Sequence, residues 1–106
     1  MREGDDLNKI TIAGRVCDKP LKIIGNTNFI ITFRLLVSKT IRMGEKKVSI
    51  FKVVLFDKVA ARWENQIAED MRLIVDGELD EVRRDAGDDR ITREVRVVGR
   101  FLQVME

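Results

Sequence analysis

Basic side chains are concentrated in the first half of the chain, where together they could bind a polyanion. Residues 9–52 contain ten lysines and arginines but only two acids, Asp18 and Glu45, a net charge of +8. Residues 53–106 contain nine basic and thirteen acidic residues, a net charge of −4. Clustered lysine and arginine attract phosphate groups, so this asymmetry indicates one basic face on an otherwise acidic protein.

Catalytic and metal-binding chemistry has little support in the sequence. There is no histidine and Cys17 is the only cysteine, so we expect neither a zinc site nor an internal disulfide. Cys17 also lacks an activating base. The paired acids at 80–81 and 88–89 have no converging partners, and no glycine-rich phosphate loop is present. We therefore expect a binding protein that is not an enzyme and uses no metal or cofactor.

Apolar and polar residues alternate along much of the chain, a pattern typical of β-strands with one buried face. Pro20 and the turn-forming residues 25–28 interrupt the alternation, and residues 40–45 and 83–90 are polar connections. The sequence predicts five strands, at residues 7–18, 29–38, 47–56, 71–82 and 91–105.

A single helix is predicted at residues 58–69, between the third and fourth strands. Asp57 has the side chain of a helix N-cap, and Val59, Trp63 and Ile67 follow at spacings of four residues. Trp63 is expected to close one end of the barrel or to line a contact between subunits.

The order of these elements predicts an all-β fold, a five-stranded Greek-key OB-fold barrel with one helix between strands 3 and 4. Residues 1–106 are expected to form a single OB-fold domain, with residues 1–6 as a flexible N-terminus. No apolar run reaches the ~18 residues of a membrane span, so no membrane contact is expected. OB-folds bind oligonucleotides on the face around strands 2 and 3, and the basic half of this chain supplies those strands.

Four segments resemble bacterial single-stranded DNA-binding proteins. They are the opening strand at 7–16, the Lys19-Pro20 pair, the strand and helix start at 51–60, and the segment at 75–79. The resemblance implies sequence-independent binding of single-stranded DNA in replication, recombination or repair. It also implies a homo-oligomer, either a dimer or a tetramer, and a cytoplasmic protein of bacterial, phage or plasmid origin.

Several positions depart from this family. Phe56 keeps an aromatic ring that the family uses to stack bases, whereas Ile50 and Arg84 stand where tryptophan or another aromatic is common. The acidic pair Glu69-Asp70 replaces the usual Lys-Gly. The chain also ends without the acidic tail through which the family recruits replication proteins, so such partners remain open, and a shortened form or a specialised paralogue is expected.

Two other interpretations remain. Residues 15–22 resemble the primosomal replication protein PriB, a relative with few aromatics that acts in replication restart and binds single-stranded DNA and partner proteins. The chain could also be an OB domain whose ligand is another protein. An RNA-binding cold-shock function is less favoured because the aromatic motifs of such strands are absent.

Binding of single-stranded DNA without sequence preference needs cations for the phosphates and flat surfaces for the bases. Phe56 is the best stacking candidate, and Phe29, Phe33, Phe51 and Phe101 are expected in the core. The predicted nucleic-acid-binding residues are Lys9, Arg15, Arg34, Lys39, Arg42, Lys46, Lys47, Ile50, Lys52, Phe56, Arg83 and Arg84.

Overall fold

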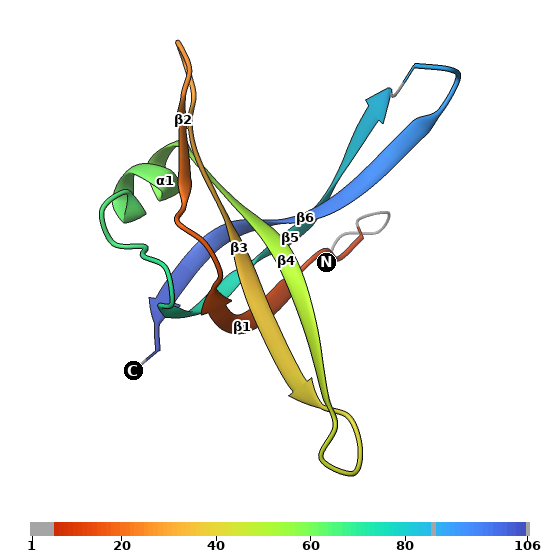
Figure 1. Ribbon diagram of the computed structural model, residues 1–106. Coiled ribbons are helices and arrows are strands. Elements are labelled where there is room, and N and C mark those ends of the chain that lie inside the picture. The colour runs from red at the N-terminus through yellow and green to blue at the C-terminus, as the bar shows by residue number, and fades with distance from the viewer. Residues whose placement is uncertain (1–5, 86, 106) are drawn as a thin grey trace.

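The computed structural model describes residues 6–85 and 87–105, so residues 1–5 of the flexible N-terminus predicted at residues 1–6 lie outside the described residues. The chain forms strands and one helix in the order shown in Figure 1. These are β1 (Ile10–Val16), β2 (Leu21–Ile24), β3 (Phe29–Thr40), β4 (Lys46–Phe56), α1 (Asp57–Trp63), β5 (Arg72–Asp85) and β6 (Ile91–Val104).

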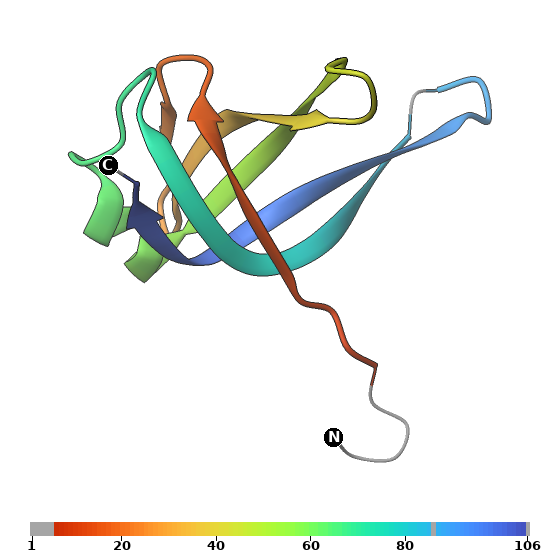
Figure 2. The same cartoon turned by 90° about the horizontal axis from the view of Figure 1, so that it is seen from below.

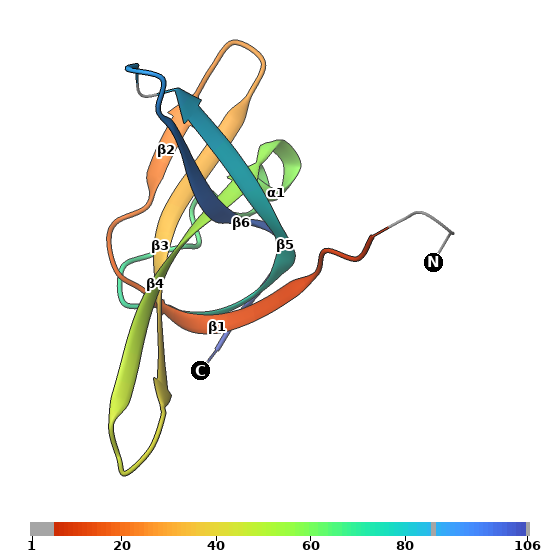
Figure 3. The same ribbon diagram turned by 90° about the vertical axis from the view of Figure 1, so that its right-hand side faces the viewer.

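The strands form one sheet in the order β1-β5-β6-β4-β3-β2, and an additional pairing of β1 with β3 closes it into a barrel. The barrel strands are therefore β1, β3, β4, β5 and β6, with β2 added at the edge of β3, as the views in Figures 2 and 3 show. This is the OB-fold predicted from the order of elements.

All pairings are antiparallel except that of β4 with β6. These two strands run parallel and pair only at Val53 with Val97 and Val54 with Val98. We call this short ladder the seam. It joins the β3–β4 hairpin to the β5–β6 hairpin, and both hairpins project from the barrel (Figure 1).

Alternate residues of each strand point into the barrel and form its core. Phe33 on β3 and Val53 on β4 are cross-strand partners and are both buried. Trp63 and Ile67 pack against this core from the end of α1 and from the turn after it. Ala60 of the helix is fully buried, so α1 covers one end of the barrel.

The strands coil tightly where β5 crosses β6. The pairing register shifts between Asp76 and Gly77, which marks a β-bulge. A Cβ added to Gly77 would lie 1.9 Å from the carbonyl oxygen of Val98, so only glycine fits there. The close approach of two backbones at this bulge allows β5 and β6 to bend around the barrel.

The secondary structure differs from the prediction at two places. Residues 21–24 form β2, whereas the sequence predicted only a connection containing a turn. They are a strand because they pair with β3, and their own sequence shows no alternation that predicts one. The helix has seven residues rather than the predicted three turns. Ile67 nevertheless packs against the core from the segment after the helix. The spacing of apolar residues therefore predicted the contact of Ile67 with the core correctly, but the predicted length of the helix was wrong.

The predicted N-cap role of Asp57 is wrong. The N-cap residue is Phe56, without a capping side chain, and Asp57 lies within the helix with a positive φ of 47°. Its carboxylate Oδ1 instead accepts a hydrogen bond of 3.1 Å from the backbone N–H of Phe29. Asp57 therefore ties the start of α1 to the start of β3.

Two of the four phenylalanines expected in the core are not buried. Phe33 is buried and Phe29 packs against the core, but Phe51 is 39% exposed and Phe101 is 71% exposed. Phe51 lies where β4 leaves the barrel. Phe101 follows the β-bulge, which changes which residues of β6 face inward.

Candidate nucleic-acid interface

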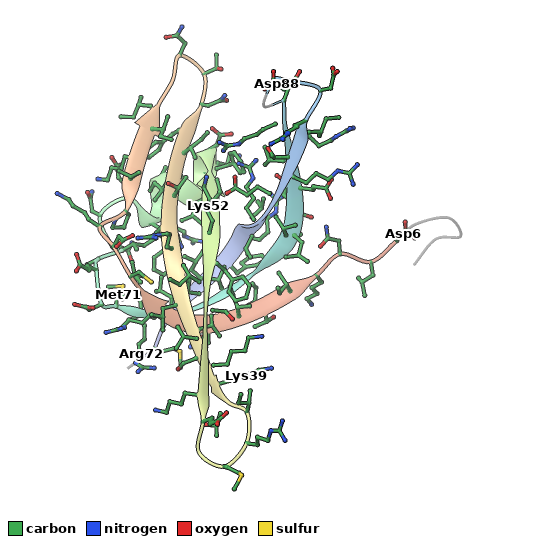
Figure 4. The ribbon with its side chains drawn as sticks, turned by 45° about the vertical axis from the view of Figure 1, so that its right-hand side comes forward. Asp6, Lys39, Lys52, Met71, Arg72 and Asp88 are labelled. Carbon is green, nitrogen blue, oxygen red and sulfur yellow. The ribbon has the colours of Figure 1, made fainter. Side chains whose placement is uncertain are left out.

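A groove of about 390 Å³ runs across the outer face of β3 and β4. Lys52, labelled in Figure 4, is one of its lining residues. The connection from β1 to β2 forms one wall, and the β5–β6 hairpin forms the other. Its lining residues are Asp18, Lys19, Leu21, Thr32, Phe33, Arg34, Ile50, Lys52 and Glu94.

The pairing of β3 with β4 brings the predicted site residues together in this groove. Arg34 is the direct cross-strand partner of Lys52, and Leu36 is the partner of Ile50. Because side chains alternate across a strand, these residues point outward while Phe33 and Val53 point inward. Arg34, Ile50 and Lys52 therefore share one outer surface.

Each of these cations faces a carboxylate. Arg34 forms an ion pair with Asp18, and Lys52 Nζ lies 3.8 Å from Glu94 Oε1. Glu94 Oε2 also lies 3.4 Å from Arg84 on the neighbouring β5, so one carboxylate links two predicted binding residues. Arg34 and Lys52 are thus held in place by internal counter-charges.

Phe56 and Arg96 form a flat pair at the end of β4. The Arg96 guanidinium carbon lies 5.5 Å from the centroid of the Phe56 ring, a cation–π distance. A hydrogen bond of 2.8 Å from Arg96 Nε to Asp80 Oδ2 fixes the guanidinium. Both planar groups could stack against a base.

Four predicted cations lie on the β3–β4 hairpin, which projects beyond the barrel near Lys39 in Figure 4. Lys39 and Lys47 are cross-strand partners and share a face, while Lys46 pairs with Thr40 and lies on the opposite face. Arg42 lies in the connecting turn. All four cations are exposed, so the hairpin is a basic arm beside the groove.

The structure does not bring three other predicted residues into the groove. Arg83 precedes Arg84 on β5 and so lies on the opposite face of the hairpin. Lys9 precedes β1 and lies beside a depression that Arg100 also lines. Arg15 is on the outer face of β1, 3.4 Å from Asp70.

Sequence reasoning did not assign Asp18, Lys19, Leu21, Thr32, Glu94 or Arg96 to the site. Alternation along β6 could have identified Arg96, because the residues on either side of it, Val95 and Val97, are apolar. No local pattern signals Asp18 or Glu94, since each acts on a cation from another strand.

Two features are absent from the described residues. Among the described residues, no three or more histidine, cysteine, aspartate or glutamate side chains are grouped so that they could hold a metal ion. Neither is there, in residues 6–85 and 87–105, a helix long and apolar enough to cross a membrane. The groove presents cations and the Phe56–Arg96 pair adds planar groups on the same outer face, so the fold and the site define a nucleic-acid-binding OB-fold domain.

The chain belongs to the Single-strand binding protein family, whose model matches residues 7–105. It is therefore a single-stranded DNA-binding protein, as the four sequence segments predicted, and members of this family are not enzymes. The match does not favour the PriB-like interpretation.

A solved structure described as "Plasmodium falciparum SSB complex with ssDNA" has the same fold. Its TM-score to this chain is 0.87, with 21% sequence identity, and the match covers 100% of both chains. No curated protein matches the chain.

Proposed function

We propose that this protein coats single-stranded DNA without sequence preference in replication, recombination or repair, and that the strand lies in the groove between β3, β4 and the β5–β6 hairpin. The observation that carries the proposal is the position of Arg34 and Lys52 beside the Phe56–Arg96 pair on one outer surface. Cations and planar groups on one face are what sequence-neutral binding requires.

The strand's phosphates replace Asp18 and Glu94 as partners of the groove cations. Lys52 and Arg34 contact the backbone, and a base stacks on the Phe56–Arg96 pair. Ile50 provides an apolar, 53% exposed surface where an aromatic ring would bind more strongly. The basic β3–β4 hairpin lies along the DNA strand and adds a contribution to the binding affinity that falls as the salt concentration rises.

We further propose that residues 1–106 form one domain and that the protein assembles as a dimer or tetramer in the cytoplasm of a bacterial, phage or plasmid system. Family membership supports the oligomer. Light scattering coupled to size exclusion measures the mass, and a monomer at all concentrations contradicts this part of the proposal.

Anisotropy of a labelled oligo-dT tests the binding mode. We expect affinity to fall with salt, with a slope near −0.7 for each phosphate neutralised, and duplex DNA to compete poorly. Lys52→Gln should lower the affinity and make the slope shallower by about 0.7.

Lys22→Gln is a matched control. Lys22 is also half-exposed and paired with a glutamate, 3.9 Å from Glu64, but lies on β2 outside the groove lining. Equal losses for both variants would contradict the groove as the DNA path.

A further inference from the structure

A second cleft, larger than the groove, lies between α1 and the end of β6. Its volume is about 730 Å³. Lys58, Arg62 and Trp63 line it from the helix, and Arg100 and Phe101 line it from the strand. Phe101 is 71% exposed, so a large ring faces solvent beside these cations.

The charge of this cleft differs from that of the groove. None of its lining residues is acidic. Arg100 is paired with Glu78 at 2.5 Å, but among the described residues Lys58 and Arg62 form no ion pair. In the groove, by contrast, Arg34 and Lys52 each face a carboxylate. An anion that enters the cleft can therefore contact Lys58 and Arg62 without first displacing a carboxylate.

The cleft and the groove share no lining residue, but β4 and β6 connect them. Lys58 follows Phe56 by two residues as β4 passes into α1, and Arg100 follows Arg96 by four residues on β6. The two strands run parallel, so both lead from the groove toward the cleft.

We propose that this cleft is a second subsite for the same DNA strand, beyond the Phe56–Arg96 pair. The proposal rests on the proposed function. A base packs against Phe101 and Trp63, and the phosphates on either side contact Arg62 and Lys58. The exposed ring and the cations repeat the two components of the proposed DNA path, and their place at the ends of the same two strands favours nucleic acid over an acidic peptide.

Oligonucleotides of two lengths test this subsite. An oligo-dT of about 6 nucleotides fits the groove alone, whereas one of about 16 nucleotides reaches the cleft. Phe101→Ala is expected to lower the affinity for the longer oligonucleotide at least about fivefold and to leave the shorter one unchanged. Arg62→Gln should make the salt slope of the longer one shallower by about 0.7.

Control variants change similar residues elsewhere. Val95→Ala truncates an exposed apolar residue on the same strand, on the opposite face from Arg96, and Arg72→Gln neutralises an exposed arginine outside the cleft. Light scattering on Phe101→Ala establishes whether the oligomer is intact. A variant that loses long-oligonucleotide binding together with its assembly overturns the subsite.

The two proposals fail in different ways. Wild-type binding of both lengths by Phe101→Ala and Arg62→Gln overturns the subsite, and an acidic peptide then becomes the ligand to test. Unchanged binding of the short oligonucleotide by Lys52→Gln overturns the groove path instead. Loss of long-oligonucleotide binding alone in both cleft variants supports the subsite.

Discussion

On the proposed binding path, replacing Glu94 with glutamine removes a negative charge that competes with DNA for Lys52 and Arg84. Glu94 contacts Lys52 at 3.8 Å and Arg84 at 3.4 Å through its two carboxylate oxygens. Glutamine keeps the size and the hydrogen-bonding capacity of the side chain but not its charge. We therefore expect Glu94→Gln to bind single-stranded DNA more tightly than the natural protein.

The magnitude follows from the exposure of the three groups, whose side chains are 36–62% exposed. Solvent-exposed pairs contribute about 0.2–1 kcal/mol each. Releasing two such pairs makes binding more favourable by about 0.5–2 kcal/mol, or about 2- to 30-fold in Kd. Each released cation should also make the salt slope steeper by about 0.7.

Salt-dependent anisotropy titrations with oligo-dT measure both quantities. Glu81→Gln is the matched control, because Glu81 lies on the same hairpin but on the opposite face, paired with Arg93 at 3.5 Å. An unchanged or weaker affinity for Glu94→Gln, with the slope of the natural protein, would refute the idea that this carboxylate competes with phosphate.

Three further predictions concern stacking and stability. Phe56→Ala should weaken binding of oligo-dT by about 1–3 kcal/mol, because a stacking surface is lost, while a circular dichroism spectrum like that of the natural protein shows that the barrel is intact. Gly77→Ala should destabilise the fold by at least about 1–3 kcal/mol, since its Cβ meets the Val98 carbonyl, whereas Gly25→Ala, with no atom closer than 3.7 Å, should leave the thermal midpoint nearly unchanged. Leu55→Ala should cost about 2–5 kcal/mol in denaturant unfolding because the side chain is fully buried, and a loss below 1 kcal/mol would contradict its place in the core.

The sequence predicted the barrel because strand alternation is a local signal. Residues 29–38 and 47–56 carry that pattern across β3 and β4, so the outward direction of Arg34 and Lys52 followed from spacing alone. Burial of Phe33 on the opposite face of β3 followed from the same rule. Alternation therefore supplied the floor of the groove.

The remaining features depend on contacts between distant segments. β2 forms by pairing with β3, and no spacing within residues 21–24 reveals that pairing. Phe101 was expected in the core because it is four residues from Val97, so regular alternation places both side chains on the same face. The bulge at Gly77 breaks this alternation on β6, and Phe101 then faces outward. The pairing of Glu94 with Lys52 joins residues 42 positions apart, so charge counting alone could not place it.

The seam between β4 and β6 has a consequence for the motions of the barrel. Only Val53 with Val97 and Val54 with Val98 pair there, whereas β3 and β4 pair along their whole shared length. Because this short ladder joins segments far apart in sequence, we expect it to close after the hairpins beside it during folding. On the proposed path, DNA passes from Lys52 on β4 to Arg96 on β6 and spans this joint, so we expect bound DNA to oppose its opening and to slow amide hydrogen exchange at the seam.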